Sequence, residues 1–310
     1  MTPLQKFLNQ LHGRFHAIGY LESDPLEFVH HYTDPWDQEC VALLAALLAY
    51  GNVKQIRRSV ADLLARIHSV AEGPADFVRR LGEPRPSRSF NAKADAVLRG
   101  FVHRFNVGED LGALLRLLSR SWREHGSLGA HFLSFLEPSA PHIGDALTGL
   151  IAEWRTWIAD DRVPPPESFG YLLTSPASGS CCKRWCMFLR WMGRKDALDP
   201  GLWTRGSGLS QTFPNKRALR SSQLILPLDT HTGRISQYLG LTPRKSLGWL
   251  AALEITEALR ACDPADPTRY DFALSRLGIL DLCQRTYRRE ICTECDLIEV
   301  CQLARQKASA

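Results

Sequence analysis

The sequence lacks the features that mark membrane, secreted and β-sheet proteins. No apolar run approaches the roughly 18 residues that a membrane-spanning helix needs. The opening stretch, MTPLQKFLNQLHGRF, does not have the charged and then apolar layout of a signal peptide. Alternation of apolar and polar residues never extends beyond a few positions, and no internal repeat is present. We therefore expect a cytoplasmic, helical protein that does not enter a membrane.

Composition and charge narrow the class further. The chain has 310 residues, of which 45% are hydrophobic and 23% are charged, so it can bury one or two ordinary cores. Its net charge of +5 is a mild positive excess. Such an excess permits binding to nucleic acid without demonstrating it, so the positions of the basic residues must decide.

The cysteines are concentrated near the end of the chain. Nine cysteines in a chain expected to be cytoplasmic indicate reduced thiols and metal ligation, not a disulfide framework. Four of them follow the pattern C-x8-C-x2-C-x5-C, namely Cys283, Cys292, Cys295 and Cys301. Four thiolates select zinc or an iron–sulfur cluster. Structural zinc usually takes two close cysteine pairs, and this segment has one, so we predict a [4Fe-4S] cluster with structural zinc as the alternative.

The spacing of apolar residues predicts an all-α protein. Apolar side chains recur every three or four positions, which places them on one face of a helix. The stretch 71–90 is rich in proline, glycine and arginine, and we expect it to be a connection. Helices are expected over residues 3–18, 35–48, 53–67, 92–105, 111–122, 128–136, 143–158, 247–261 and 268–282.

The helix that begins at Pro35 is expected to be central. Asp34 is a suitable N-cap, and the residues from Val41 to Leu48 are apolar nearly all round. The helix stops at the sequence Tyr50, Gly51 and Asn52. A plain glycine stop is the direct interpretation of this break.

A second turn precedes another expected helix, which carries Trp185, Phe188, Leu189 and Met192. Gly179 and Ser180 form a small-residue turn in the string SPASGSCCKRWCMFLRW. Free backbone N–H groups at the start of a helix bind phosphate, and Lys183 and Arg184 add positive charge there. Alone, this pattern is equally typical of an ordinary helix junction.

The string LILPLDTHTGRISQYLGL places an acidic residue at the start of another helix. Asp229 precedes a helix that carries Ile235, Tyr238 and Leu239 and ends at Gly240. Aspartate is a preferred N-cap, so this position has a purely structural explanation.

Taken in order, these motifs resemble the helix-hairpin-helix glycosylase (HhH-GPD) superfamily. The string LDTHTGR is similar to the superfamily motif V-D-T-H-[VI]-x-R, with Asp229, Thr230, His231 and Arg234 matching. The tail C-x2-C-x5-C is similar to the iron–sulfur loop of endonuclease III and adenine glycosylase. Within the superfamily the sequence resembles most an uncharacterised branch, through DPWDQECVALLAALLAYG, SCCKRWCMFLRW and PLDTH.

The resemblance implies a two-lobed helical fold and base-excision chemistry. It implies a six-helix-barrel-like lobe at residues 35–227, with an extra helical region at about 71–169, and a second lobe formed by residues 1–34 and 228–310, with the cluster loop at 283–301. Double-stranded DNA is the expected partner of a monomer, RNA is the second possibility, and Asp229 corresponds to the catalytic carboxylate. The implied nucleic-acid contacts are Gly179, Ser180, Lys183, Arg184, Arg234, Arg285, Arg288, Arg289, Tyr50 and Asn52.

Two departures from the pattern limit the activity that is expected. The first gap of the cysteine segment is x8, where the superfamily has x6. Alignment of Gly179 with the second glycine of the endonuclease III hairpin places Cys181 where that enzyme has its Schiff-base lysine, and Lys183 lies half a helical turn further round. We therefore expect a DNA glycosylase without lyase activity, and a non-catalytic DNA- or RNA-binding protein of the same fold as the alternative.

Overall fold

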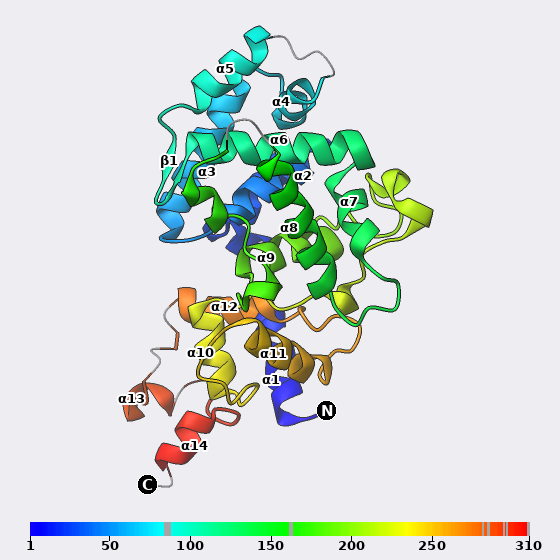
Figure 1. Ribbon diagram of the computed structural model, residues 1–310. Coiled ribbons are helices and arrows are strands. Elements are labelled where there is room, and N and C mark those ends of the chain that lie inside the picture. Colours follow the sequence, from blue (N-terminus) through cyan, green and yellow to red (C-terminus); the bar gives the residue numbers. More distant parts are fainter. Residues whose placement is uncertain are drawn as a thin grey trace.

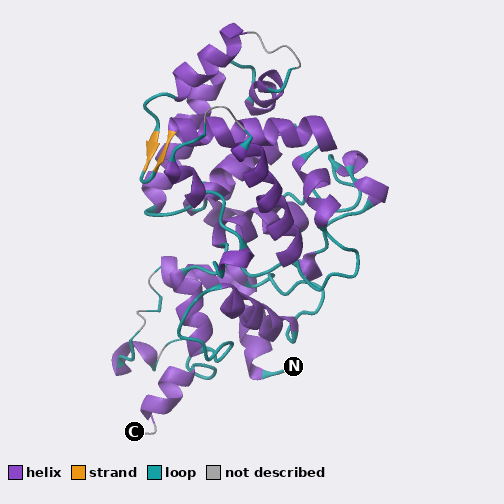
Figure 2. Cartoon of the chain, in the orientation of Figure 1, coloured by secondary structure: helices purple, strands orange, loops and turns teal. Residues whose placement is uncertain are grey.

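The protein is helical throughout, as the computed structural model shows (Figures 1 and 2). The structure describes residues 1–83, 88–160, 164–280, 282–283, 286–293, 295 and 297–308. Its α-helices are α1 (Pro3–Phe15), α2 (Pro35–Leu47), α3 (Val53–His68), α4 (Pro74–Leu81), α5 (Arg88–Leu98), α6 (Gly108–His125), α7 (Leu128–Phe135), α8 (Gly144–Ala159), α9 (Lys183–Gly193), α10 (Thr230–Tyr238), α11 (Trp249–Arg260), α12 (Asp271–Ile279), α13 (Arg289–Cys292) and α14 (Gln302–Ala308).

Short 3-10 helices and one small hairpin connect these elements. The 3-10 helices are η1 (Ile18–Ser23), η2 (Pro25–His31), η3 (Glu167–Tyr171), η4 (Pro176–Ser178), η5 (Ser210–Thr212), η6 (Pro214–Lys216) and η7 (Ser221–Gln223). The hairpin pairs β1 (Val102–His103) with β2 (Asn106–Val107) in antiparallel register. It lies at one side of the upper half of the molecule in Figure 2. The expectation of an all-α class is thus confirmed, apart from this hairpin.

Helix α2 runs through the centre of the upper half, between η2 and α9. Asp34 caps it through its Oδ1, which accepts hydrogen bonds from the backbone N–H groups of Trp36 and Asp37. Every residue from Glu39 to Leu47 is buried, in agreement with the apolar pattern. The segment η2, which precedes residue 35, packs on α2. Some residues before 35 therefore also contact the upper half.

A buried carboxylate joins α2 to the extra helical region. Glu39 is fully buried and accepts hydrogen bonds from the indoles of Trp122 (2.6 Å) and Trp203 (2.7 Å). It also accepts the backbone N–H groups of Leu128 (3.1 Å) and Gly129 (3.0 Å) at the start of α7. Burial raises the pKa of Glu39, and these four donors oppose that rise. The carboxylate of Glu39 therefore holds together residues that lie far apart in the sequence.

The lower half contains α1 and α10 to α14 (Figure 1), and buried ion pairs tie it to α9. Helix α12 packs against both α1 and α10. From α9, Arg190 reaches Asp271 of α12 at 2.6 Å and Asp199 at 3.3 Å. Arg194 reaches Asp199 at 2.6 Å. All four side chains are almost fully buried, so the two halves share a charged core.

Two expected segments differ from the structure. The helix expected at 92–105 is α5, which ends at Leu98, and Gly100 with φ +77° leads into the hairpin. The stretch 71–90, expected to be a connection, contains the two-turn helix α4, whose Phe77 and Val78 are buried. Proline at the first position of α4 starts this helix and does not break one. The other helices with expected bounds agree within three residues at each end.

The described helices were also compared with the length and apolarity that a bilayer requires. None of those in the described ranges is both long and apolar enough to cross a membrane.

Candidate functional site

Asp229 is the N-cap of α10, as its sequence position predicts. Its backbone is extended, and its Oδ1 accepts the backbone N–H of Thr232 at 2.7 Å. The side chain is half-buried. Its second oxygen, Oδ2, has no hydrogen-bond partner among the described residues. The carboxylate therefore serves the helix with one oxygen and leaves the other for a ligand.

The turn at Gly179 lies beside Asp229. Gly179 follows η4, is exposed, and has φ +75°, a conformation that favours glycine. Its carbonyl accepts the backbone N–H of Trp249 at 2.9 Å. The Cys181 thiol donates to the carbonyl of Leu228 at 3.3 Å, directly before Asp229. The structure thus brings together the turn and the acidic residue, which are about 50 positions apart in the sequence.

Ser180 and Cys182 shape the start of α9. The Ser180 hydroxyl accepts the backbone N–H of Cys182 at 3.2 Å, so this side chain stabilises the turn itself. Cys182 has φ +48° and provides no side-chain cap for α9. The start of the helix is therefore shaped by the backbone of a left-handed residue, which the sequence pattern does not reveal.

The two basic residues after this turn are not positioned as the sequence suggests. Arg184 is only 6% exposed, and its guanidinium donates to the carbonyls of Leu47 (2.8 Å) and Tyr171. The ammonium of Lys183 donates to the carbonyl of Ala49 at 3.1 Å. Both cations cap the C-terminal end of α2, where a helix dipole favours positive charge. The expectation that Arg184 contacts phosphate is wrong, because burial removes it from the surface.

Tyr50 and Asn52 also have structural roles. The hydroxyl of Tyr50 lies within hydrogen-bond distance of two acceptors. These are the carbonyl of His103 at 2.9 Å and Oδ1 of Asn106 at 2.6 Å. Burial raises the pKa of Tyr50 to about 12. Asn52 caps α3 by accepting the backbone N–H of Lys54 at 2.9 Å. Tyr50 and Asn52 thus stabilise the fold, and their contact with nucleic acid stays a prediction. Helix α2 itself ends at Leu47, with Leu48 as its C-cap, before the turn at Gly51.

Near Asp229, a second carboxylate lies in the charged core. Burial is the main cause that raises the pKa of Asp271 to about 6, and the nearby charges of Arg190 and Arg194 lower it. The negative charge of Asp229 also raises the pKa of Asp271. Asp229 is therefore close enough to the core of the molecule to interact electrostatically with it.

The four cysteines of the C-terminal segment line one cavity. Cys283 follows α12, Cys292 ends α13, Cys295 follows α13, and Cys301 directly precedes α14. The cavity between these elements is small, with a volume of about 30 Å³. Its other lining residues are mostly apolar, namely Tyr238, Leu282, Thr286, Tyr287, Ile291, Leu297, Ile298, Leu303 and Ala304. Four soft donors that face one apolar cavity have the composition of a cluster site.

The thiols influence one another electrostatically. Burial is the main cause that raises the pKa of Cys295, and the charges of Cys283, Cys292 and Cys301 raise it further. The backbone N–H of Arg288 donates to the sulfur of Cys292 at 3.4 Å.

The four sulfurs do not form a tight group in this structure. Among the described residues, which include all four cysteines, no three of these sulfurs lie within 4.8 Å of one another.

Only some of the arginines predicted to contact nucleic acid near the cysteine segment belong to the described residues. Arg288 and Arg289 are exposed, as is Arg234 on α10. Arg285 lies outside the described residues. The exposed side chains face solvent and remain available to a polyanion.

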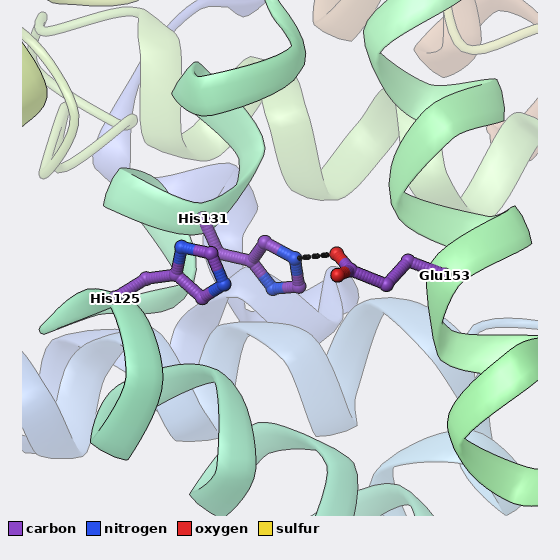
Figure 3. A group of neighbouring side chains, drawn as sticks. All are labelled: His125, His131 and Glu153. Atoms are coloured by element: carbon purple, nitrogen blue, oxygen red, sulfur yellow. Dashed lines mark hydrogen bonds and ion pairs between the residues drawn. The ribbon is translucent and has the colours of Figure 1, made fainter.

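Another group of possible ligands lies in the upper half (Figure 3). His125, His131 and Glu153 come from α6, α7 and α8. The ring of His131 is bonded at both nitrogens, to Glu153 at 2.5 Å and to the hydroxyl of Ser121 at 3.0 Å. The two histidine rings stack with centroids 4.0 Å apart and planes 6° apart. Because metals bind imidazole in the ring plane, parallel stacked rings cannot both point at one ion. This group is a hydrogen-bonded packing cluster.

The aromatic residues around Tyr50 form a group that the sequence analysis did not identify. Phe105 at the hairpin tip and Tyr171 at the end of η3 pack against Tyr50. The three residues lie far apart in the sequence and follow no shared spacing. No sequence signal could have identified this group.

One known protein family matches most of the chain. A model for a protein family of unknown function, DUF2400, matches residues 24–280. The chain belongs to this family. The DUF2400 match contains Gly179, Asp229 and the extra helical region, and it ends before the cysteine segment. No curated protein and no solved structure matches the chain.

Proposed function

We propose that this DUF2400 protein binds DNA as a member of the helix-hairpin-helix glycosylase superfamily and hydrolyses the N-glycosidic bond of an extruded base. The observation that carries the proposal is the contact between the Cys181 thiol and the carbonyl of Leu228. In the superfamily alignment, Cys181 occupies the lysine position of the hairpin, and the next residue after Leu228 is Asp229. The two positions that define the active site in that superfamily are therefore neighbours.

The geometry of Asp229 suits this reaction. Cleavage of the bond builds positive charge on the sugar, and an ionised carboxylate beside C1′ stabilises that charge. The Oδ2 oxygen accepts a proton from the attacking water, the water oxygen bonds to C1′, and the bonding electrons leave with the base. Extrusion of the target nucleotide costs about a few kcal/mol, which contacts with the protein must offset.

Cys181 limits the reaction to this single step. A lyase forms a Schiff base through an amine, and the thiol at position 181 donates to a backbone carbonyl instead. Lys183, the nearest amine in the sequence, is bonded to the carbonyl of Ala49. Neither side chain offers a free amine beside Asp229, so we propose a glycosylase without lyase activity.

The cysteine segment is proposed to hold a [4Fe-4S] cluster through Cys283, Cys292, Cys295 and Cys301. The shared cavity and the mutual electrostatic effect on Cys295 support a bound inorganic centre, and the single close cysteine pair of the sequence favours a cluster over zinc. When bound, such a cluster supplies four metal–sulfur bonds that fix the segment. Arg288 and Arg289 would then be exposed on a rigid support, where guanidinium groups bind phosphate.

A panel of labelled duplexes with different modified bases tests the proposal. After incubation and treatment with alkali, the wild-type protein is expected to give a strand break at one type of base. Asp229→Asn should abolish the product and keep binding, because asparagine caps a helix as well as aspartate does. Asp34→Asn is the matched control, since Asp34 caps α2 through the same kind of bond.

The second candidate is a non-catalytic DNA-binding protein of the same fold. It is favoured by the fact that Asp229 lines none of five cavities found between the described residues. Tight binding without a strand break at any base, unchanged in Asp229→Asn, would select this candidate and exclude the glycosylase.

A further inference from the structure

The tip of the β1–β2 hairpin exposes an unusual amount of aromatic surface. Phe105 is 57% exposed and Tyr171 is 41% exposed, and Val102 beside them is 61% exposed. Phe105 and Tyr50 are nearly parallel, with ring centroids 6.2 Å apart. Tyr171 lies edge-on to Tyr50 at 4.8 Å and to Phe105 at 5.5 Å. We call Tyr50, Phe105 and Tyr171 the aromatic cluster.

The aromatic cluster is held by a buried hydrogen-bond network. The ring of His103 in β1 is bonded to the hydroxyl of Ser59 at 2.9 Å and to the carbonyl of Tyr50 at 3.1 Å. Asn106 in β2 donates to Oδ2 of Asp110 at 2.8 Å. These bonds fasten the hairpin to α3 and α6, so the exposed rings keep their places without a ligand. Preorganised rings lose little conformational entropy on binding.

Arginines flank the cluster on two sides. Arg184 lies inside, with its guanidinium carbon 5.0 Å from the Tyr50 ring centre and 4.3 Å from that of Tyr171. Arg104 lies outside, 5.4 Å from the ring centre of Phe105, and is exposed. Guanidinium groups at these distances interact favourably with ring faces.

Arg104 packs against Gly51. A Cβ atom on Gly51 would lie 2.7 Å from Nη1 and 2.9 Å from Cδ of Arg104, so the arginine covers this glycine. Arg104 itself has φ +54°, a conformation that non-glycine residues rarely adopt. The exposed cation therefore lies beside the turn that follows α2.

We propose that Phe105, Tyr171 and Arg104 form a stacking site for an unpaired nucleobase of DNA. Exposed ring faces accept a base by stacking, and an adjacent arginine binds the phosphate that accompanies it. A bound peptide strand would instead need a free sheet edge, and the two-residue strands of this hairpin offer little of one. The inference shares DNA as the ligand with the proposed function, but it requires no catalysis by Asp229.

The test uses a duplex with one unpaired 2-aminopurine, whose fluorescence falls when it stacks on an aromatic ring. Wild-type protein is expected to quench the probe and to bind it more tightly than the fully paired duplex. Phe105→Ala should weaken binding of the unpaired probe about tenfold or more and remove the quenching. Phe105→Leu should have the same effect, because stacking requires the ring. This variant keeps an apolar side chain at the position, so it separates stacking from general apolar contact.

Leu250→Ala is the matched control, since Leu250 is also 57% exposed but lies on α11. It should leave both signals unchanged. Equal behaviour of Phe105→Ala and Leu250→Ala, retained quenching in Phe105→Leu, or a wild-type protein that does not bind the unpaired probe would overturn the inference. Tighter binding of the matching RNA would overturn the assignment to DNA.

The outcome is separable from that of the glycosylase proposal. Binding and quenching that depend on Phe105, combined with no base removal from any duplex, would exclude only the glycosylase. Base removal that depends on Asp229 but not on Phe105 would exclude only the stacking site.

Discussion

Two groups of possible metal ligands in this molecule differ in what their donor atoms already do. In the histidine group, His131 is bonded at both ring nitrogens, and its ring is parallel to that of His125. In the cysteine segment, the four cysteines line one mostly apolar cavity, where we propose an inorganic centre. The histidine donors lie close together, yet their existing bonds and their stacking prevent them from sharing one ion. Closeness of donor atoms is therefore a weaker indicator than their existing bonds.

The same contrast separates two parts of the protein. In the upper half, the buried side chains of Glu39 and His131 find their partners within the chain. In the lower half, the cysteine segment is proposed to need an inorganic centre to complete its core. We expect the end of the lower half to depend on its cluster.

The largest expected effect is the loss of metal in Cys295→Ser. Wild-type protein should contain about four iron atoms per chain, with matching sulfide, and the variant should contain almost none. Without the cluster, residues 283–308 should be cleaved rapidly in limited proteolysis. Elemental analysis and mass spectrometry of the fragments measure both results.

Cys262→Ser is the control, because Cys262 lies in the same half but does not line the cavity. It should keep its iron. One zinc ion per chain in the wild type would select the alternative metal, and iron that persists in Cys295→Ser would contradict the ligand assignment. Loss of iron from His131→Gln would instead indicate that the histidine group binds the metal.

The next largest effect is expected for Glu39→Ala. This change leaves two indole and two backbone donors without a partner in a dry core, so the free energy of unfolding should fall by about 3–5 kcal/mol. Urea denaturation measures the change. Glu257→Ala, at a side chain that is 74% exposed, should stay within about 0.5 kcal/mol of the wild type. Equal effects of the two substitutions would refute the role assigned to Glu39.

The smallest expected effect is a pH dependence caused by His131. Burial lowers the pKa of His131 from 6.5 to about 4 in the folded protein, so between these values the unfolded chain binds more protons. Stability should therefore rise with pH from about 4 to 6.5, by up to about 3 kcal/mol. His131→Gln should flatten this slope in urea titrations, and His31→Gln, at an exposed position, should not. A slope that survives in His131→Gln would assign the effect elsewhere.

Local signals in the sequence were sufficient to predict the helices and their caps. Asp34 and Asp229 were expected as N-caps, and both accept the hydrogen bonds that define a cap. A break after α2 was also predicted, and it contains Gly51 with φ +100°, a conformation that favours glycine. Each of these features depends on a few neighbouring residues.

Features that depend on distant partners were missed. Arg184 looked like a surface cation, because nothing in its neighbourhood shows that it reaches the carbonyl of Leu47. The hairpin at 102–107 was read as the end of a helix, since two-residue strands are too short to show alternation. The extra helical region, which had no counterpart in the glycosylase resemblance, lies inside the DUF2400 match and provides Phe105. Its role follows from contacts across the fold.

The ion pairs between α9 and α12 have a mechanical consequence. Opening a hinge between the halves would separate Arg190 from Asp271 and expose or strand charges that are now almost fully buried. Breaking such a pair costs about 3–5 kcal/mol, so a clamp-like closing motion is strongly disfavoured. A ligand that contacts both halves must therefore adapt its own shape to a protein that keeps its shape.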